Sequence, residues 1–232
     1  MAPVTIVVEG SSILYRRAER AVMSISVSSE GKNQEKVSSE VTQTSNSLQA
    51  MLRDLAPRTE NGEPAARAAV THWTMRSLST GSYVPYTDKG NKSERKFTAS
   101  TSFEVKFRDF AKLGTVATTL SSMPHVSIRS IDWRLTDKTK DGLGSQARKD
   151  AIGDAMKKAQ DYAEAIGGGK LAPFEVTEGA ALNAASAYQP QQRLMAVRAS
   201  GGAYGDELNF EPEDVSVVSN ITVKFSAEWS EK

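Results

Sequence analysis

The sequence predicts an α+β protein with a ferredoxin-like split βαβ core, and three observations support this fold class. Strand-like and helix-like segments follow one another in the order ββαββαβαββ over 232 residues. Residues 97–108 alternate strictly between apolar and polar, as a half-buried strand does, and a later segment carries alanine at every fourth position. We expect a single domain over residues 1–232. Its ferredoxin-like core spans 21–137, while 1–20 and 138–232 add a helix and terminal strands as a second, smaller layer.

The first third of the chain predicts two strands and a long helix. Residues 4–10 alternate weakly, and Met23, Ile25 and Val27 alternate with serines. A helix is expected from about Asn33 to Leu55, with Pro57 just beyond its end. Its apolar residues form one stripe at helical spacing: Val37, Val41, Leu48, Met51, Leu52 and Leu55.

The middle of the chain predicts three strands and a short helix. A long, irregular strand is expected over residues 66–79, followed by the polar loop "TGSYVPYTDKGNKSER" and the alternating strand. Asp109 is placed to cap a helix that Pro124 closes. In the strand "HVSIRSIDWRL" the apolar phase slips by one residue across Arg129-Ser130, which predicts a β-bulge.

A second long helix is expected from about Leu143 to Ile166. Residues four apart are neighbours on a helix, and alanine lets another backbone approach closely, so we expect a packing ladder of Ala147, Ala151, Ala155, Ala159 and Ala163, widened by Ile152, Met156, Tyr162 and Ile166. The following "GGGK" is similar to a phosphate-binding loop, but such loops precede a helix. Here the glycines follow one, so Gly167 to Gly169 are interpreted as a helix stop.

The last part of the chain predicts two strands separated by a long excursion. "LAPFEVTEG" is expected to form a short strand, and residues 215–229 a long one. The excursion, residues 183–214, is rich in Ala, Ser, Gln and Gly, yet apolar residues interrupt it. We predict that these residues form subunit contacts: Tyr188, Leu194, Met195, Val197, Tyr204, Leu208 and Phe210.

Several of these segments together resemble the SIMPL-domain family, also called DUF541. The resemblance rests on "VVEGSS", "KFTASTSFEVKFRDFAKLG", the stretch from Val126 to Gly179, and the closing "VSVVSNITVKFSAEW". It extends over nearly the whole chain, from Val4 to Trp229. The family includes bacterial periplasmic immunogenic and oxidative-stress-defence proteins, and an animal signalling protein that binds a Pelle-like kinase.

The resemblance implies a two-part α+β protein that assembles into ring-like oligomers, in a setting of stress response or signalling. It supplies no catalytic residues. Bacterial members carry a signal peptide and usually a Pro-Asp pair before the second strand, where this sequence has "RRAER". We therefore expect a cytoplasmic protein rather than a periplasmic one.

Composition and motifs argue against an enzyme or a metalloprotein. The chain has no cysteine, and His72 and His125 have no acidic or histidine neighbour at ligand spacing. Asp132, Asp137 and Asp141, with Asp150 and Asp154, are interleaved with basic residues and read as a solvated turn. We expect no catalytic residue, no metal and no cofactor, although an enzyme of unknown class stays a second alternative. No segment is long and apolar enough to span a membrane.

RNA binding is the first alternative. The βαββαβ order with Phe97, Phe103 and Phe107 on one strand face resembles an RNA-recognition sheet. The net charge of +1 and the lack of the aromatic motif of such sheets count against nucleic acid. The preferred hypothesis is a non-catalytic protein that acts through homo-oligomers and contacts with an unknown protein partner.

Overall fold

The structure, a computed structural model, describes residues 4–86, 92–167, 170–179, 208 and 210–227. The chain divides into two compact units. The ferredoxin-like unit comprises residues 18–134 and 202–213, and the strand–helix unit comprises residues 1–17, 135–201 and 214–232. Each unit has its own hydrophobic core.

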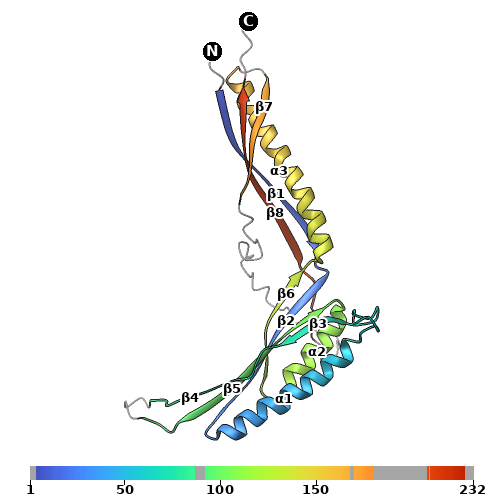
Figure 1. Ribbon diagram of the computed structural model, residues 1–232, viewed down its shortest axis with the longest axis vertical. Coiled ribbons are helices and arrows are strands. Elements are labelled where there is room, and N and C mark those ends of the chain that lie inside the picture. The colour runs from blue at the N-terminus through green and yellow to red at the C-terminus, as the bar shows by residue number, and fades with distance from the viewer. Residues whose placement is uncertain (1–3, 87–91, 168–169, 180–207, 209, 228–232) are drawn as a thin grey trace, which may run out of the picture. The chain divides into compact units, whose positions relative to one another are not determined.

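The ferredoxin-like unit has the split βαβ topology that the sequence predicts. Its antiparallel sheet has the order β3-β5-β2-β6, and β4 pairs with the first half of β5 (Figure 1). The elements are β2 (Arg20–Gly31), α1 (Gln34–Leu55), β3 (Val70–Met75), β4 (Ser79–Tyr83), β5 (Lys96–Phe107), α2 (Phe110–Ser122) and β6 (Val126–Arg134).

A capping residue precedes each helix of this unit, and the cap predicted at Asp109 is confirmed. The Asn33 side chain accepts a hydrogen bond from the Lys36 backbone N–H, and that of Asp109 accepts one from the Lys112 N–H. Helix α1 packs over β2 and β5, helix α2 packs over β6, and their apolar stripes join Phe103, Val105 and Phe107 in one core. This core lies between the two helices and the sheet.

The predicted β-bulge in β6 is confirmed. Ser24 of β2 pairs with Ser130, but Ile25 pairs with Ile128, so Arg129 is the extra residue. The bulge explains the phase slip, because it lets Ile128 and Ile131 both pack on the core.

The strand predicted over residues 66–79 is wrong in its extent. It is confined to β3, and β4 follows inside the stretch that we expected to be a loop. Both pair with β5, and Arg76 bridges the gap by donating its backbone N–H to the Ser102 carbonyl. Every residue of β4 is exposed, so no apolar alternation marks it.

The strand–helix unit is a three-stranded antiparallel sheet with one helix on one face. The strands are β1 (Val4–Arg17), β8 (Asp214–Ala227) and β7 (Leu171–Glu178), in the order β1-β8-β7. The helix is α3 (Asp137–Ala165), which packs over β1 and β8 rather than over β7 (Figure 1).

The predicted start of α3 is wrong, whereas its predicted end is confirmed. The helix begins at Asp137, where the Thr136 side chain caps it, and not at Leu143. Gly142 and Gly144 hid the first turns, because glycine weakens a helical pattern, and the expected acidic turn is therefore helical. Gly167 has φ +72° and donates its N–H to the Glu164 carbonyl, which makes it a helix stop.

Candidate functional site: exposed surfaces of the strand–helix unit

The alanine ladder is the packing surface of α3. All five alanines are fully buried, and four of them join Ile6, Val8 and the inward side chains of β8 in the core. Gly10 of β1 lies under this ladder, so close that an added Cβ would come within 2.8 Å of the Ala155 Cβ and nearer still to the Ala151 carbonyl. Small residues on both elements therefore allow the helix to touch the strand backbone.

The four large residues expected to widen the ladder do not belong to it. Ile152, Met156, Tyr162 and Ile166 are between 39% and 58% exposed. The buried residues of α3 are all alanines. The larger side chains beside them lie outside the contact between the helix and the sheet. The periodicity locates them beside the ladder but does not show how narrow the contact is.

A pair of charges on α3 covers the outer edge of β1. The Asp154 carboxylate accepts a hydrogen bond from the Ser11 backbone N–H at 2.9 Å. The Lys158 ammonium donates to the Glu9 carbonyl at 2.9 Å and to the same Asp154 carboxylate at 2.7 Å. The ion pair with Lys158, and then the Ser11 N–H, lower the pKa of Asp154 below its ordinary value.

These contacts satisfy two backbone groups that an edge strand would otherwise expose. The sequence analysis did not predict these contacts of Asp154 and Lys158 with β1. Their spacing of four residues marks an ion pair, but the contact with β1 joins residues more than 140 positions apart, and no local pattern records it.

The sheet face opposite α3 carries exposed apolar side chains. Side chains alternate along a strand, and Ile6, Val8 and Gly10 face the helix. Val7, Ile13 and Tyr15 therefore face away from it, with 50–65% of each exposed. Ile13 stands beside half-buried Val218 of β8, which extends the apolar surface to the central strand. We call Val7, Ile13, Tyr15 and Val218 the open apolar face.

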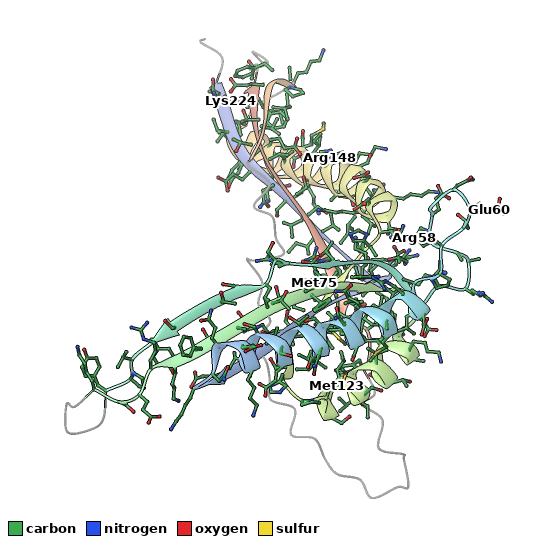
Figure 2. The ribbon with its side chains drawn as sticks, turned by 60° about the horizontal axis from the view of Figure 1, so that its bottom comes forward. Arg58, Glu60, Met75, Met123, Arg148 and Lys224 are labelled. Carbon is green, nitrogen blue, oxygen red and sulfur yellow. The ribbon has the colours of Figure 1, made fainter. Side chains whose placement is uncertain are left out.

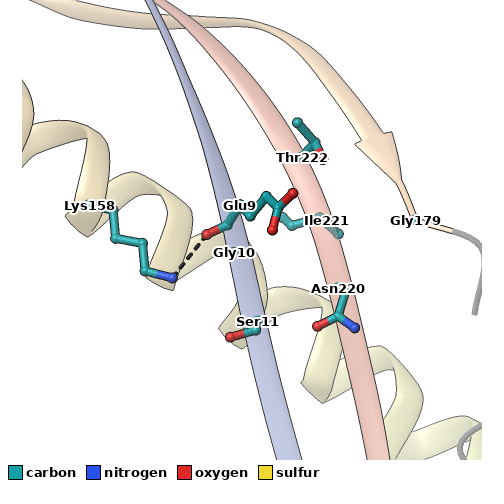
Figure 3. Close-up of a pocket in the computed structure, with 8 residues that line it drawn as sticks. All are labelled: Glu9, Gly10, Ser11, Lys158, Gly179, Asn220, Ile221 and Thr222. Atoms are coloured by element: carbon teal, nitrogen blue, oxygen red, sulfur yellow. Dashed lines mark hydrogen bonds between the residues drawn. The ribbon is translucent and has the colours of Figure 1, made fainter. Parts of the chain in front are cut away.

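A polar hollow of about 350 Å³ lies next to this face (Figure 3). Its lining comprises Glu9, Gly10, Ser11, Lys158, Gly179, Asn220, Ile221 and Thr222. The Lys158 ammonium is already bonded to Glu9 and Asp154, and the lining contains no histidine. The hollow thus lacks the paired base and nucleophile of acyl-transfer sites.

One group of residues in the ferredoxin-like unit combines a serine, a carboxylate and a histidine. The Ser29 hydroxyl donates to the Glu40 carboxylate at 2.6 Å, and His125 Nε2 lies 3.9 Å from the same oxygen. In a catalytic triad the histidine stands between the serine and the acid. Here the acid stands between them, so no base activates the serine. This pairing ties α1 to β2 and supplies no nucleophile.

The aromatic face proposed for RNA binding is not available for stacking. Phe103 and Phe107 are fully buried in the core that the two helices of the ferredoxin-like unit cover. The other face of β2 and β5 carries Ser24, Ser28, Ser100 and Ser102. The observed sheet therefore lacks the base-stacking arrangement of RNA-recognition modules.

Two of the seven predicted subunit contacts lie within the described residues. The Leu208 N–H donates to the Thr118 hydroxyl at 2.9 Å, and its side chain is exposed. Phe210 is partly buried against the core of its own ferredoxin-like unit. Tyr188, Leu194, Met195, Val197 and Tyr204 lie outside the described residues, so their role stays a prediction.

The described residues provide neither a group of metal ligands nor a membrane-spanning helix. In that part of the chain no three His, Asp or Glu side chains are grouped as a metal ion would require. Asp137 and Asp141 lie on α3 instead of in a loop. No described helix is long and apolar enough to cross a bilayer.

The fold defines an α+β protein of two units. The strand–helix unit has exposed apolar side chains both on β1 and on α3. Comparison with protein families places the chain: residues 6–225 match SIMPL, described as a protein of unknown function (DUF541). The chain belongs to the SIMPL family. Comparison with curated proteins gave no significant match.

Proposed function

We propose that this protein is a non-catalytic assembly protein, which acts by forming homo-oligomers that in turn contact another protein. The open apolar face is the observation that carries the proposal. Ile13 and Tyr15 project from consecutive outward positions of β1, and Val7 lies three outward positions before Ile13. Exposed apolar side chains gathered on one face of a sheet mark interaction sites.

The composition of the core beneath α3 supports the same proposal. Five of the ten buried residues of this core are alanines. Alanine removes little apolar surface from water, so a single helix on three strands gains less from burial than a larger core would. An additional layer supplied by another subunit would cover the open apolar face and stabilise the unit.

The family resemblance suggests where such an assembly would act. Related proteins take part in stress defence or in signalling, so an oligomer that recruits a protein partner suits either setting. The absence of an activated nucleophile among the described residues favours recruitment over catalysis.

The test measures the mass of the protein in solution. Light scattering at micromolar concentration should give a multiple of the 25.1 kDa chain mass. Ile13→Lys and Tyr15→Lys should each lower that mass, because a lysine cannot be buried without a partner. Tyr86→Lys is the matched control, since Tyr86 is equally exposed but belongs to the ferredoxin-like unit.

The proposal is wrong if the unmodified protein is a monomer at this concentration. An oligomer whose mass is unchanged by both lysine substitutions would instead exclude the open apolar face as the contact.

A further inference from the structure

One flank of α3 carries a row of side chains that the described part of its own chain leaves exposed. The row has four-residue spacing and consists of Arg148, Ile152, Met156, Gln160 and Glu164, which we call the α3 flank. All five are exposed. Residues at this spacing are adjacent on a helix surface and form a continuous ridge.

The α3 flank lies on the opposite side of the alanine ladder from the Asp154–Lys158 pair. That pair reaches the outer edge of β1, and at 100° per residue the flank falls on the other side of the buried alanines. It therefore points toward the side of β7, which α3 does not cover. Val176 of β7 is exposed on the same side of the sheet, because it pairs with buried Val223.

Gly153 leaves space for a second backbone beside the α3 flank. It lies within α3 next to Ile152, and an added Cβ would meet nothing within 4 Å. Glycine inside a helix lowers helix stability relative to alanine. A glycine on an exposed helix surface, beside exposed Ile152 and Met156, suits the close approach of an external backbone.

The charges at the two ends of the α3 flank favour a second copy of the same helix as its partner. Arg148 is eight residues before Met156 and Glu164 is eight residues after it. If a second α3 lies antiparallel across a two-fold axis at Met156, each Arg148 faces the other copy's Glu164. Ile152 then faces Gln160 and Met156 faces its own copy, so the flank is complementary to itself.

Neither end of the row has an ion partner in the described part of its own chain. The Glu164 carboxylate accepts a hydrogen bond from the Gln160 amide at 2.9 Å. Among the described residues neither Glu164 nor Arg148 forms an ion pair. Figure 2 shows Arg148 on α3. A two-fold interface uses the same patch on both copies, and an opposite charge at each end of one apolar row meets that requirement.

We propose that α3 is a dimerisation helix: two copies of the protein pack their α3 flanks antiparallel about Met156, with an Arg148–Glu164 ion pair at each end. This inference rests on the proposed homo-oligomeric function and identifies one of its interfaces. Interdigitation of the four-residue ridges of two helices is the commonest helix–helix arrangement, and it brings two such rows side by side where the helices cross.

Charge reversal tests the pairing directly. Arg148→Glu alone and Glu164→Arg alone each place like charges at both ends of the interface, so each should weaken dimerisation by about tenfold or more. The double variant Arg148→Glu with Glu164→Arg restores opposite charges and should regain the wild-type mass in light scattering. Circular dichroism of each variant checks that the fold is kept.

Cysteine crosslinking gives an independent readout, because the chain contains no cysteine. Met156→Cys places two thiols at the two-fold axis and should give a disulfide-linked dimer on a non-reducing gel after mild oxidation. Tyr162→Cys is the matched control: Tyr162 is exposed on the other flank of the same helix, and this variant should stay uncrosslinked.

An oligomer of wild-type mass that neither crosslinks through Met156→Cys nor responds to charge reversal would overturn this inference and leave the proposed function standing. A wild-type chain that is monomeric would overturn both.

Discussion

At the scale of single residues, the glycines of this chain differ in what their missing side chain permits. Gly10 lies against the α3 backbone. Gly10→Ala should therefore lower the free energy of unfolding by roughly 1–3 kcal/mol, because the new methyl group would push the helix from the sheet. Chemical denaturation of the purified variant measures this loss.

Gly142→Ala is the matched control for the Gly10 substitution. Gly142 lies in exposed helix, and an added Cβ would meet nothing within 4 Å. Alanine should stabilise this position by up to about 1 kcal/mol through helix propensity. If Gly10→Ala is as well tolerated as Gly142→Ala, the close contact between β1 and α3 does not exist in solution.

Asp154 predicts a pH dependence with a defined sign. Its pKa is lowered in the folded protein, first by Lys158 and then by the Ser11 N–H. A carboxyl with a depressed folded pKa stabilises the protein above its unfolded pKa, near about 3.9. That contribution should be lost as the pH falls through the lower, folded value.

The comparison with Asp154→Asn isolates this contribution. The wild-type protein should be the more stable of the two near neutral pH, and the difference should shrink below about pH 4. Asp150→Asn is the control, because it removes a carboxylate from the same helix without a contact to β1. A difference that stays constant with pH would show that the Asp154 charge does not act on β1.

At the scale of elements, the alanine ladder defines how closely α3 approaches its sheet. Ala155 of α3 is fully buried against Gly10 of β1. Ala155→Leu should overpack this contact and cost about 1–3 kcal/mol in chemical denaturation. Ala165→Leu makes the same substitution at an exposed position of α3 and should be nearly neutral. Equal stabilities of the Ala155→Leu and Ala165→Leu variants would mean that the alanine ladder does not pack against the sheet.

Elements with strong periodicity could be predicted from the sequence alone. The stripe of α1, the alternation of β5 and the bulge at Arg129 all follow from side-chain spacing, because each buries one face against one core. β4 could not be predicted, because its exposed residues leave no pattern. The first turns of α3 were hidden by Gly142 and Gly144, whose low helix propensity is outweighed by the capping residue Thr136 and by the helix that follows.

The exposed surfaces were less predictable than the elements. Four-residue spacing identified the ladder, but whether Met156 is buried depends on the width of the sheet beneath it. The edge contact of Asp154 with Ser11 joins distant parts of the chain, so composition and periodicity do not contain it. Apolar residues of β1 were visible in the sequence, and only the position of α3 shows which of them face away from the core.

At the scale of the whole molecule, the chain contains two separate hydrophobic cores that differ in the size of their buried side chains. The ferredoxin-like unit buries large side chains such as Phe103, Leu48 and Leu120, whereas the strand–helix unit relies on alanines. Buried apolar area sets much of the stability of a unit. The strand–helix unit should therefore unfold first when the chain is heated as a monomer.

This order of unfolding can be followed with two probes. In Trp229→Phe the remaining tryptophans, Trp73 and Trp133, both belong to the ferredoxin-like unit. Their fluorescence should change at a higher temperature than the first loss of helical circular dichroism, to which the 29 residues of α3 contribute. Probes that disagree in this way indicate more than one transition.

Core substitutions then assign each transition to its unit. Leu48→Ala, at a fully buried position of α1, should cost about 2–5 kcal/mol and lower only the fluorescence transition. Ala155→Leu should lower only the earlier one. Coincident transitions in both backgrounds would show that the two units unfold together. Assembly through the strand–helix unit should raise the first transition as the protein concentration increases, since subunits that bind only the folded state stabilise it by mass action.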